Sequence, residues 1–291
     1  MKNILFYGGA SLLSNMWLNY WNLKYNIFLG LNKRWIEFNF AKSIKISNDK
    51  SETKDILSNN NIDTIINCAG ITNVEECEQN PDQAKKINGF LPADLAEVCL
   101  DLNIKLIHIS TDHLYDGLNK MVDENDPLCP LNVYGESKAF GDNQVLKNND
   151  RALIIRTNFF GDGPTYKKSF SDKIIHSLKN DRKIYLFDNV YYTPIHIFEL
   201  ADSVESLINL DIKGVINISC DERITKYDFG MMIAKKLQFN DKLIEPIKIE
   251  DKKDLTIRPK DMSLSNRKLK TLLRKPQISI IDQINFLNHI I

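Results

Sequence analysis

A tyrosine and a lysine four residues apart are the strongest chemical signal in the sequence. Tyr134 and Lys138 lie in the segment VYGESK, residues 133–138. If this segment begins a helix, both side chains project from one face. A nearby ammonium lowers the pKa of a phenol, which is ordinarily about 10. The pair therefore indicates a general acid–base catalyst that works near neutral pH, with an ordinary helix surface as the alternative.

Two hydroxyl side chains follow an apolar run. Ser110 and Thr111 lie in HISTDHLYDG, residues 108–117. In an open parallel sheet, ligands bind beyond the carboxyl ends of the strands. The two hydroxyls could therefore hold a substrate carbonyl oxygen. In the alternative interpretation, Thr111 and Asp112 cap a turn.

The stretch FYGGASLLSN, residues 6–15, resembles a degraded glycine loop. The pattern G-x-x-G-x-x-G would fall on Gly8, Ser11 and Ser14, so two of its three glycines are serines. A glycine loop lets the backbone approach a pyrophosphate, whose charge is favoured by a helix N-terminus. Serine is small, so dinucleotide binding is still predicted, with Gly8, Ser11, Leu12 and Leu13 as contacts.

The segment LNKR, residues 31–34, bears on the type of cofactor. An acidic residue at the end of the second strand would bind the ribose 2′-hydroxyl and favour NAD. Lys33 and Arg34 stand there instead and could bind a 2′-phosphate. NADPH is therefore the predicted cofactor, with NADH as the second choice. The alternative is that both residues are solvated surface charges.

These residues need a scaffold, and the first two-thirds of the chain alternates apolar runs with helix-type segments. The expected strands are 3–7, 25–30, 43–47, 64–69, 105–110 and 152–156, and the expected helices are 12–23, 51–59, 81–102 and 133–147. Nearly continuous apolar runs are typical of strands that are covered on both faces. Pro92 should kink or break the third helix. The alternation predicts an α/β fold, a Rossmann-type doubly wound parallel sheet.

After residue 157 the alternation of strand-type and helix-type segments becomes less regular. Further strands are expected at 182–187 and 214–219, and further helices at 196–209, 226–237 and 279–290. We assign residues 1–157 to a dinucleotide-binding domain, to which later segments return. Residues 158–291 are assigned mainly to a smaller substrate-binding lobe.

Composition excludes several classes of partner. Lys and Arg together number 38, as do Asp and Glu, so the formal net charge is zero and neither nucleic acid nor a membrane surface is expected as a partner. The five cysteines form no C-x-x-C pair, which favours free thiols, no metal site and a cytoplasmic location. No signal peptide is recognised, and no apolar run reaches the 18 or so residues of a membrane helix.

Several long motifs resemble one known family, the extended short-chain dehydrogenases/reductases, and within it the dTDP-4-dehydrorhamnose reductase group. The motifs are NCAGITNVEECEQNPDQAKKIN (67–88), ISTDHLYDG (109–117), ENDPLCPLNVYGESKAFGD (124–142), IIRTNFFG (154–161) and RPKDMSLSNRKL (258–269). The resemblance implies a catalytic set of Thr111, Tyr134 and Lys138. Tyr134 would protonate the C4 oxygen as hydride arrives, and Thr111 would hydrogen-bond the same oxygen. Lys138 would lower the pKa of Tyr134 and bind the nicotinamide ribose.

The resemblance also implies further contacts. Those expected to reach the cofactor are Cys68, Ala69, Gly70 and Asn88, together with Tyr134 and Lys138. Those expected to reach the substrate are Thr72, Ser110, Thr111, Phe159 and Arg258. His113 stands where many relatives have a tyrosine, so a local contact is expected to differ.

The function implied is reduction of the 4-keto group of a nucleotide-linked 4-keto-6-deoxy sugar, for deoxysugar or polysaccharide biosynthesis. The partner would be the nucleotide sugar, and a homodimer is the hypothesis for the assembly. One alternative is a non-catalytic dinucleotide-binding subunit like the beta subunit of methionine adenosyltransferase. Another is a nucleotide-sugar epimerase or a combined epimerase and reductase.

Overall fold

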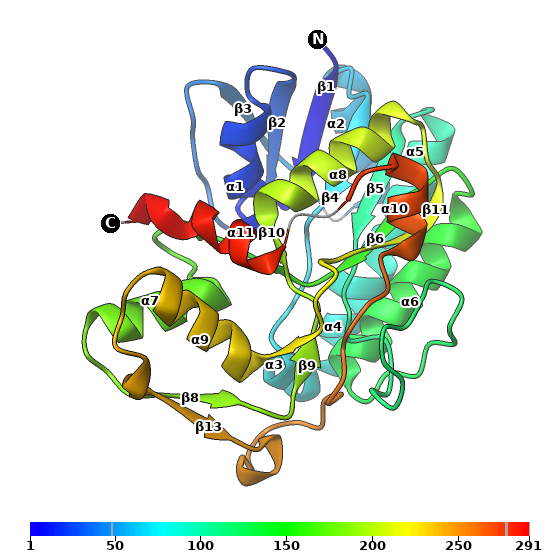
Figure 1. Cartoon of the computed structure of the whole chain (residues 1–291). Helices are drawn as coiled ribbons and strands as arrows, with labels where there is room; N and C mark the ends of the chain where they lie inside the picture. The colour runs from blue at the N-terminus through cyan, green and yellow to red at the C-terminus, as the bar shows by residue number, and fades with distance from the viewer. Residues whose placement is uncertain (48, 277–278, 291) are drawn as a thin grey trace.

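A parallel sheet of seven strands forms the centre of the computed structural model, which describes residues 1–47, 49–276 and 279–290 (Figure 1). The strands are β1 (Asn3–Tyr7), β2 (Asn26–Leu31), β3 (Ala41–Lys45), β4 (Thr64–Asn67), β5 (Lys105–Ile109), β6 (Leu153–Thr157) and β11 (Gly214–Ile218). Their spatial order is β11-β6-β5-β4-β1-β2-β3. The order reverses direction between β1 and β4, and such a switch point is where Rossmann-type sheets bind ligands. The predicted fold class is confirmed.

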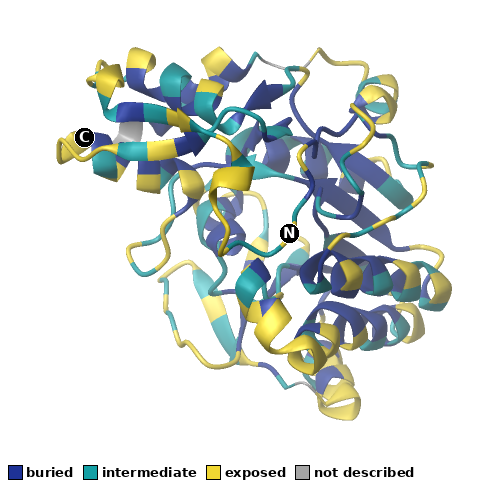
Figure 2. Ribbon diagram, turned by 90° about the horizontal axis from the view of Figure 1, so that it is seen from below, coloured by how far each residue is buried: buried dark blue, intermediate teal, exposed yellow. Residues whose placement is uncertain are grey.

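Alternate residues of each strand face opposite layers of helices, as the pleat requires. On β1, Ile4 and Phe6 pack in the cluster of α1 (Leu12–Trp21) and α8 (Ile197–Asn209). Leu5 and Tyr7 pack in a second cluster, with α2 (Lys50–Asn59), α5 (Leu91–Asp101) and α6 (Val133–Asn148). Figure 2 shows buried strands between helices whose outer surfaces are exposed. Burial on both faces explains the continuous apolar runs in the sequence.

The third expected helix is interrupted near Pro92. It comprises α4 (Pro81–Lys85), the π-helical turn η1 (Lys86–Phe90) and α5. Pro92 lies in the first turn of α5, where its missing N–H would have no helical partner in any case. The π turn presses on α6, because a Cβ added at Gly141 would lie 2.2 Å from the carbonyl oxygen of Asn88. Gly141 therefore lets η1 pack closely against α6.

A smaller lobe with its own apolar core lies beside the carboxyl ends of the main strands (Figure 1). Its main elements are α7 (Phe170–Lys179), α9 (Lys226–Lys236), α11 (Ile280–Ile284) and the parallel pair β8 (Ile184–Phe187) and β13 (Ile244–Ile247). Short strands β7 (Phe159–Phe160), β9 (Tyr191–Tyr192), β10 (Ile195–His196) and β12 (Ile224–Thr225) connect this lobe to the sheet. The chain crosses back to the main sheet through α8, β11 and α10 (Arg267–Leu273).

The remaining regular segments are short. They are α3 (Val74–Gln79) and the 3-10 turns η2 (Asp241–Leu243), η3 (Ile249–Asp251) and η4 (Asn285–Ile290). Helices α3, α7 and α10 were not expected from the sequence. All five cysteines are free thiols. Among the described residues, no helix has the length and apolarity needed to span a membrane.

Candidate active site

A cavity of about 460 Å³ opens at the carboxyl ends of β1, β4 and β5. Twelve residues expected at the site line it: Ser11, Leu12, Leu13, Cys68, Ala69, Gly70, Thr72, Ser110, Thr111, Tyr134, Lys138 and Phe159. The other expected residues, namely Gly8, Lys33, Arg34, Asn88 and Arg258, lie outside this lining. The cavity thus joins the glycine-type loop, the Ser-Thr pair and the Tyr-Lys pair in one place.

The loop after β1 keeps the one glycine that its conformation demands. Gly8 has φ +85°, and a Cβ there would lie 2.8 Å from the backbone nitrogen of Ala69. A side chain at this position would therefore be strained and would clash. Gly8 does not line the cavity, and its role is to let the loop pass closely over the segment that follows β4.

The two serines that replace glycines bind the loop to itself. Ser11 is the N-cap of α1, and its hydroxyl accepts from the Ser14 N–H at 3.1 Å. The Ser14 hydroxyl is fully buried and donates to the Gly8 carbonyl at 3.2 Å. The two Oγ atoms are 2.7 Å apart. The buried Ser14 side chain is thus hydrogen-bonded to the loop, and α1 still packs on the sheet through Trp17 and Leu18.

The start of α1 can hold an anion. Leu12 and Leu13 occupy the first two helical positions, whose N–H groups have no acceptor within the helix. Both residues line the cavity, and the helix dipole favours negative charge there. Ser110 and Thr157 add buried hydroxyls at the cavity for which the described residues offer no partner. These features fit the pyrophosphate and ribose of a dinucleotide.

Tyr134 stands in the first turn of α6, and its hydroxyl is hydrogen-bonded by Thr111. Asn132 caps this helix by accepting from the Gly135 N–H at 2.9 Å. A Cβ on Gly135 would lie 2.4 Å from the carbonyl oxygen of His113, so glycine lets the helix approach the loop after β5. The Asn132 cap and the close approach of Gly135 to the loop after β5 therefore hold Tyr134 beside Thr111.

The direction of the Tyr134 pKa corrects the sequence-based expectation. Burial raises the pKa of Tyr134 above its ordinary value, and the Thr111 hydrogen bond only partly opposes this. A lowering by Lys138 was expected, but removal of the phenol from water is the larger effect. In the ligand-free chain the phenol is therefore held protonated, as a proton donor must be.

Lys138 lies one helical turn further along α6 and is 4% exposed. Its ammonium donates to the Ile109 carbonyl at 2.8 Å. Burial lowers the pKa of Lys138 to about 8, against the opposing effects of Asp142 and Cys68. This lysine can therefore exchange a proton near neutral pH.

Asn88 organises the site from outside the cavity. Its side-chain amide donates to the Ile71 carbonyl and to the Ser137 hydroxyl, each at 3.0 Å, and accepts from the Ile71 N–H at 2.8 Å. Both N–H groups of this amide are therefore used within the protein, and the contact with a cofactor stays a prediction. Asn88 holds the loop after β4 against α6.

Lys33 and Arg34 are exposed beyond the end of β2. The Arg34 guanidinium lies 4.4 Å from the ring centre of Tyr166. The Tyr166 hydroxyl donates to the Ala10 carbonyl at 3.2 Å and accepts from Asn15 at 2.8 Å. Arg34 is thus linked through Tyr166 to the loop that begins α1.

A second basic group lies toward the smaller lobe. Arg258 forms an ion pair with Glu75. The Lys226 amine lies 3.3 Å from the ring centre of Tyr192, and burial lowers its pKa to about 8 while Asp112 opposes the shift. Arg258 and Lys226 lie close enough for the charge of Arg258 to lower the pKa of Lys226 further. Neither Arg258 nor Lys226 is among the residues that line the cavity.

His113, where a different local contact was expected, packs against Tyr134. Its ring meets the Tyr134 ring edge-on, with centroids 5.4 Å apart. Burial lowers the pKa of His113, with Asp112 opposing and Lys226 and Arg258 reinforcing the shift. The imidazole is therefore neutral in the cavity wall.

Several lining residues were missed by sequence reasoning: Ile109, Asp112, Thr157, Asn158, Lys167, Lys168, Ser169 and Phe170. Asn158 donates to Asp112 at 2.6 Å and so fixes the residue next to Thr111. The only early signal was position, because Thr157 and Asn158 directly follow an apolar strand. Lys167 and Lys168 precede α7 in a segment that matches no fixed pattern.

The chemistry of the site does not point to a metal. Within the part of the chain that the structure describes, no group of three or more His, Cys, Asp or Glu side chains is placed to hold an ion.

Known proteins resemble this chain in sequence. The family model of the RmlD substrate binding domain matches residues 24–283. The probable low-salt glycan biosynthesis reductase Agl14 of Haloferax volcanii is 31% identical over 217 residues, which are 73% of this chain and 72% of that protein. Methionine adenosyltransferase 2 subunit beta of Rattus norvegicus is 28% identical over 215 residues, 72% of this chain and 64% of that protein.

Solved structures share the fold over almost the whole chain. A hypothetical dTDP-4-dehydrorhamnose reductase from Sulfolobus tokodaii has a TM-score of 0.84 and 25% identity, covering 97% of this chain and 99% of its own. The dTDP-4-dehydrorhamnose reductase of Bacillus anthracis, in complex with NADP, also has a TM-score of 0.84, with 20% identity and 99% of both chains covered.

Proposed function

The chain belongs to the family of the RmlD substrate binding domain, and from this premise we propose that it is a reductase of nucleotide-linked sugars. The proposed reaction is the NADPH-dependent reduction of the 4-keto group of a nucleotide-linked 4-keto-6-deoxy sugar. One observation carries the proposal: Thr111, Tyr134 and Lys138 line the same cavity as the free N-terminus of α1. Acid catalyst and anion site are therefore within reach of one bound dinucleotide.

NADPH, when bound, supplies the hydride that reaches the carbonyl carbon. Tyr134 gives its hydroxyl proton to the carbonyl oxygen, so that the ketone becomes a secondary alcohol. The raised pKa of the buried phenol keeps this proton in place until a substrate arrives. Thr111, which hydrogen-bonds the phenol, orients it and offers the substrate oxygen a second hydroxyl.

Lys138 is proposed to bind the nicotinamide ribose and to return a proton to Tyr134. Its pKa of about 8 makes both the charged and the neutral form accessible near neutral pH. The Ile109 carbonyl, which accepts from the amine at 2.8 Å, holds its position. Leu12 and Leu13 are proposed to bind the pyrophosphate through their backbone N–H groups.

Anion recognition by Arg258 and Lys226 would select the nucleotide part of the substrate. Arg258 offers a planar fork suited to phosphate oxygens. Lys226 is close enough to Asp112 for that carboxylate to raise the pKa of the amine, and its charge in turn lowers the pKa of His113. A diphosphate that links a sugar to a nucleoside would contact both cations.

A non-catalytic role is the second candidate, favoured by the match to methionine adenosyltransferase 2 subunit beta and by the self-bonded Ser11 and Ser14. Such a protein would bind a dinucleotide and leave it unoxidised. The retained Thr111, Tyr134 and Lys138 favour the reductase.

The experiment is to follow NADPH oxidation by the purified protein against a panel of nucleotide-linked 4-keto sugars. Turnover is expected with at least one of them. Y134F should bind NADPH as tightly as wild type yet lose turnover by about 10²-fold or more. Y185F, at an exposed tyrosine of β8, is the matched control and should keep full activity. Tight NADPH binding without oxidation by any sugar would instead support the regulatory role.

A further inference from the structure

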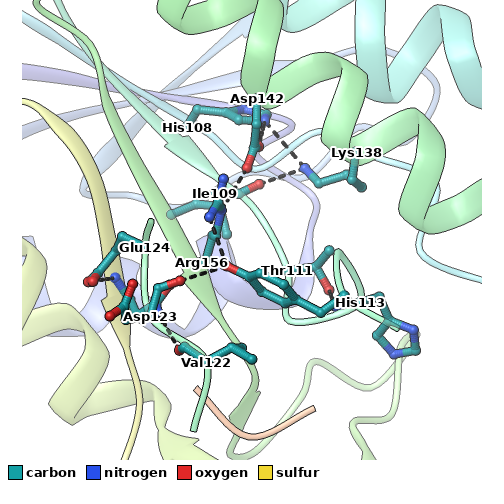
Figure 3. A network of polar contacts seen from close by, with 12 residues as sticks. His108, Ile109, Thr111, His113, Val122, Asp123, Glu124, Lys138, Asp142 and Arg156 are labelled. Carbon is teal, nitrogen blue, oxygen red and sulfur yellow. Dashed lines mark hydrogen bonds and ion pairs between the residues drawn. The ribbon is translucent and has the colours of Figure 1, made fainter. Parts of the chain in front are cut away.

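His108 contacts Lys138, and the proposed chemistry gives this histidine no role. His108 is on β5 and is 1% exposed. Its Nε2 atom is 3.4 Å from the Lys138 amine nitrogen and 3.8 Å from Oδ1 of Asp142 (Figure 3). A buried imidazole in contact with a buried amine bears on which of the two holds a proton.

The tautomer of His108 is fixed by its neighbour on β4. The Ala69 N–H donates to Oδ1 of Asn67 at 3.1 Å, which settles the orientation of that amide. The amide nitrogen of Asn67 then faces Nδ1 of His108 at 3.1 Å. Because an amide nitrogen can only donate, Nδ1 must accept. Burial and the Lys138 charge lower the pKa of His108 well below its ordinary value, so the ring is neutral and its one proton is on Nε2.

We propose that His108 is a positioning residue for Lys138, with its Nε2–H directed at the amine and at the free oxygen of Asp142. An ammonium offers only donors, so this N–H opposes it, whereas a neutral amine can accept from the N–H. The arrangement therefore favours release of a proton from Lys138 into the cavity. Asn67, whose amide donates to Nδ1 and so fixes the tautomer of the imidazole, is a second positioning residue in this arrangement.

Asp142 completes the arrangement on the far side of the ring. Its Oδ2 accepts from the Arg156 guanidinium at 3.1 Å, whereas its Oδ1 has no partner among the described residues other than the nearby His108 ring. Arg156 also donates to the Tyr115 hydroxyl at 2.8 Å. The guanidinium thus holds the carboxylate in place, and one oxygen is left facing Nε2.

The charged and titratable groups around Lys138 come from three elements. Asp142 lies on its own helix and favours the ammonium, as does Cys68 after β4. His108 on β5 opposes it. Burial is the largest cause of the lowered pKa of Lys138, and the Nε2–H of His108 is proposed to act in the same direction. The consequence for turnover rests on the proposed reductase function, but the tautomer and the lysine titration do not, because both can be measured without substrate.

The first measurement is ¹⁵N NMR of the ligand-free, histidine-labelled chain. The ring signals of His108 are identified by their loss in H108N. A neutral ring with its proton on Nε2 is expected across neutral pH. A proton on Nδ1, or a ring that is charged at neutral pH, would overturn the proposal.

The second measurement is the titration of Lys138 by NMR of lysine labelled at Cε, with the signal assigned by its loss in K138M. In H108N the pKa of Lys138 should rise toward its ordinary value, because the opposing N–H is gone. The matched control is H176N at the exposed His176 of α7, which should leave the titration of Lys138 unchanged.

An unchanged Lys138 titration in a folded H108N would show that His108 only fills space, and would refute the proposal. If H108N does not fold, N67L offers the same test. Without the Asn67 amide the ring proton can move to Nδ1, so Nε2 can accept from the ammonium and the pKa of Lys138 should again rise. A correct tautomer in a protein that reduces no sugar would leave this inference standing and defeat only the reductase proposal.

Discussion

Ser11 and Ser14 bind each other across the first turn of α1, with their hydroxyl oxygens 2.7 Å apart. This contact occupies the place where a glycine-rich loop would leave bare backbone. The turn remains a helix N-terminus with the amides of Leu12 and Leu13 open to the cavity. Replacing glycine has therefore changed how the loop is held together and has kept its capacity for an anion.

Ser11→Ala removes the N-cap of α1, and we expect it to lower the free energy of unfolding by about 1 kcal/mol. It should also weaken NADPH binding, because the cap positions the amides that face the pyrophosphate. Urea denaturation and NADPH fluorescence titration measure the two effects. Asp49→Ala removes a comparable cap at α2, far from the cavity, and should cost stability alone. Equal NADPH affinity in S11A and wild type would show that Ser11 is only a cap.

Lys33 and Arg34 changed together to Ala should weaken NADPH binding by about tenfold or more and leave NADH binding nearly unchanged. The reason is that charged hydrogen bonds to a 2′-phosphate are each worth about 1.5–3 kcal/mol. Dissociation constants for the two nucleotides give the answer. The exposed pair Lys235 and Lys236 on α9, changed in the same way, is the control. Equal weakening of both nucleotides would count against the 2′-phosphate assignment.

Lys138→Met should alter how stability depends on pH. The pKa of Lys138 is lowered from 10.5 to about 8 in the folded chain, so the unfolded chain binds more protons between these values. Wild-type stability therefore rises with pH through this window. K138M lacks that rise. Below pH 8 its free energy of unfolding should exceed that of wild type by at most about 3 kcal/mol, and this difference should vanish by pH 10.5.

Urea denaturation of both proteins at a series of pH values measures this difference. The same substitution at exposed Lys235 should not reproduce it. A constant gap between K138M and wild type across the window would mean that the lysine is not charged at a cost in the folded chain.

Arg156→Met should be strongly destabilising. Asp142 is fully buried, and Arg156 is the cation that pairs with it at 3.1 Å. Removing one member of a buried pair leaves the other charge uncompensated, at a cost of about 3–5 kcal/mol. Replacing both members, as in D142L/R156M, should recover much of the loss. The exposed pair of Lys54 and Asp101 provides the comparison, since K54A should cost less than about 1 kcal/mol.

The inner strands of the main sheet were predictable because their burial on both faces leaves a plain apolar signature, whereas the edge strand β3 has no buried residue. The helix at Tyr134 was predictable because a motif marks it. Helix α7 was missed although Ser169 and Asp172 form a capping box at its start, because the loose pattern after residue 157 hid the signal. Helix α3 is only six residues long, which is too short for a periodic pattern to emerge.

The electrostatics of the site could not be read from spacing. The spacing of four positions from Tyr134 to Lys138 places both side chains on one face of a helix, as expected, but it says nothing of how deeply either is buried. Burial reverses the direction of the Tyr134 pKa. His108 reads as one residue in an apolar strand, and its contacts with Asn67 and Lys138 join three separate elements.

The core of the smaller lobe has a consequence for how the protein is made. Ile280 and Ile284 of α11 pack with Phe229 and Phe160, and Gln283 accepts from the His196 N–H at 2.6 Å. Strands β1 to β6, by contrast, pair among themselves within the first 157 residues. A nascent chain can thus assemble most of its sheet early on the ribosome. The core of the smaller lobe is complete only after Leu287 has emerged, so a half-made chain holds the sheet without a finished second lobe beside it.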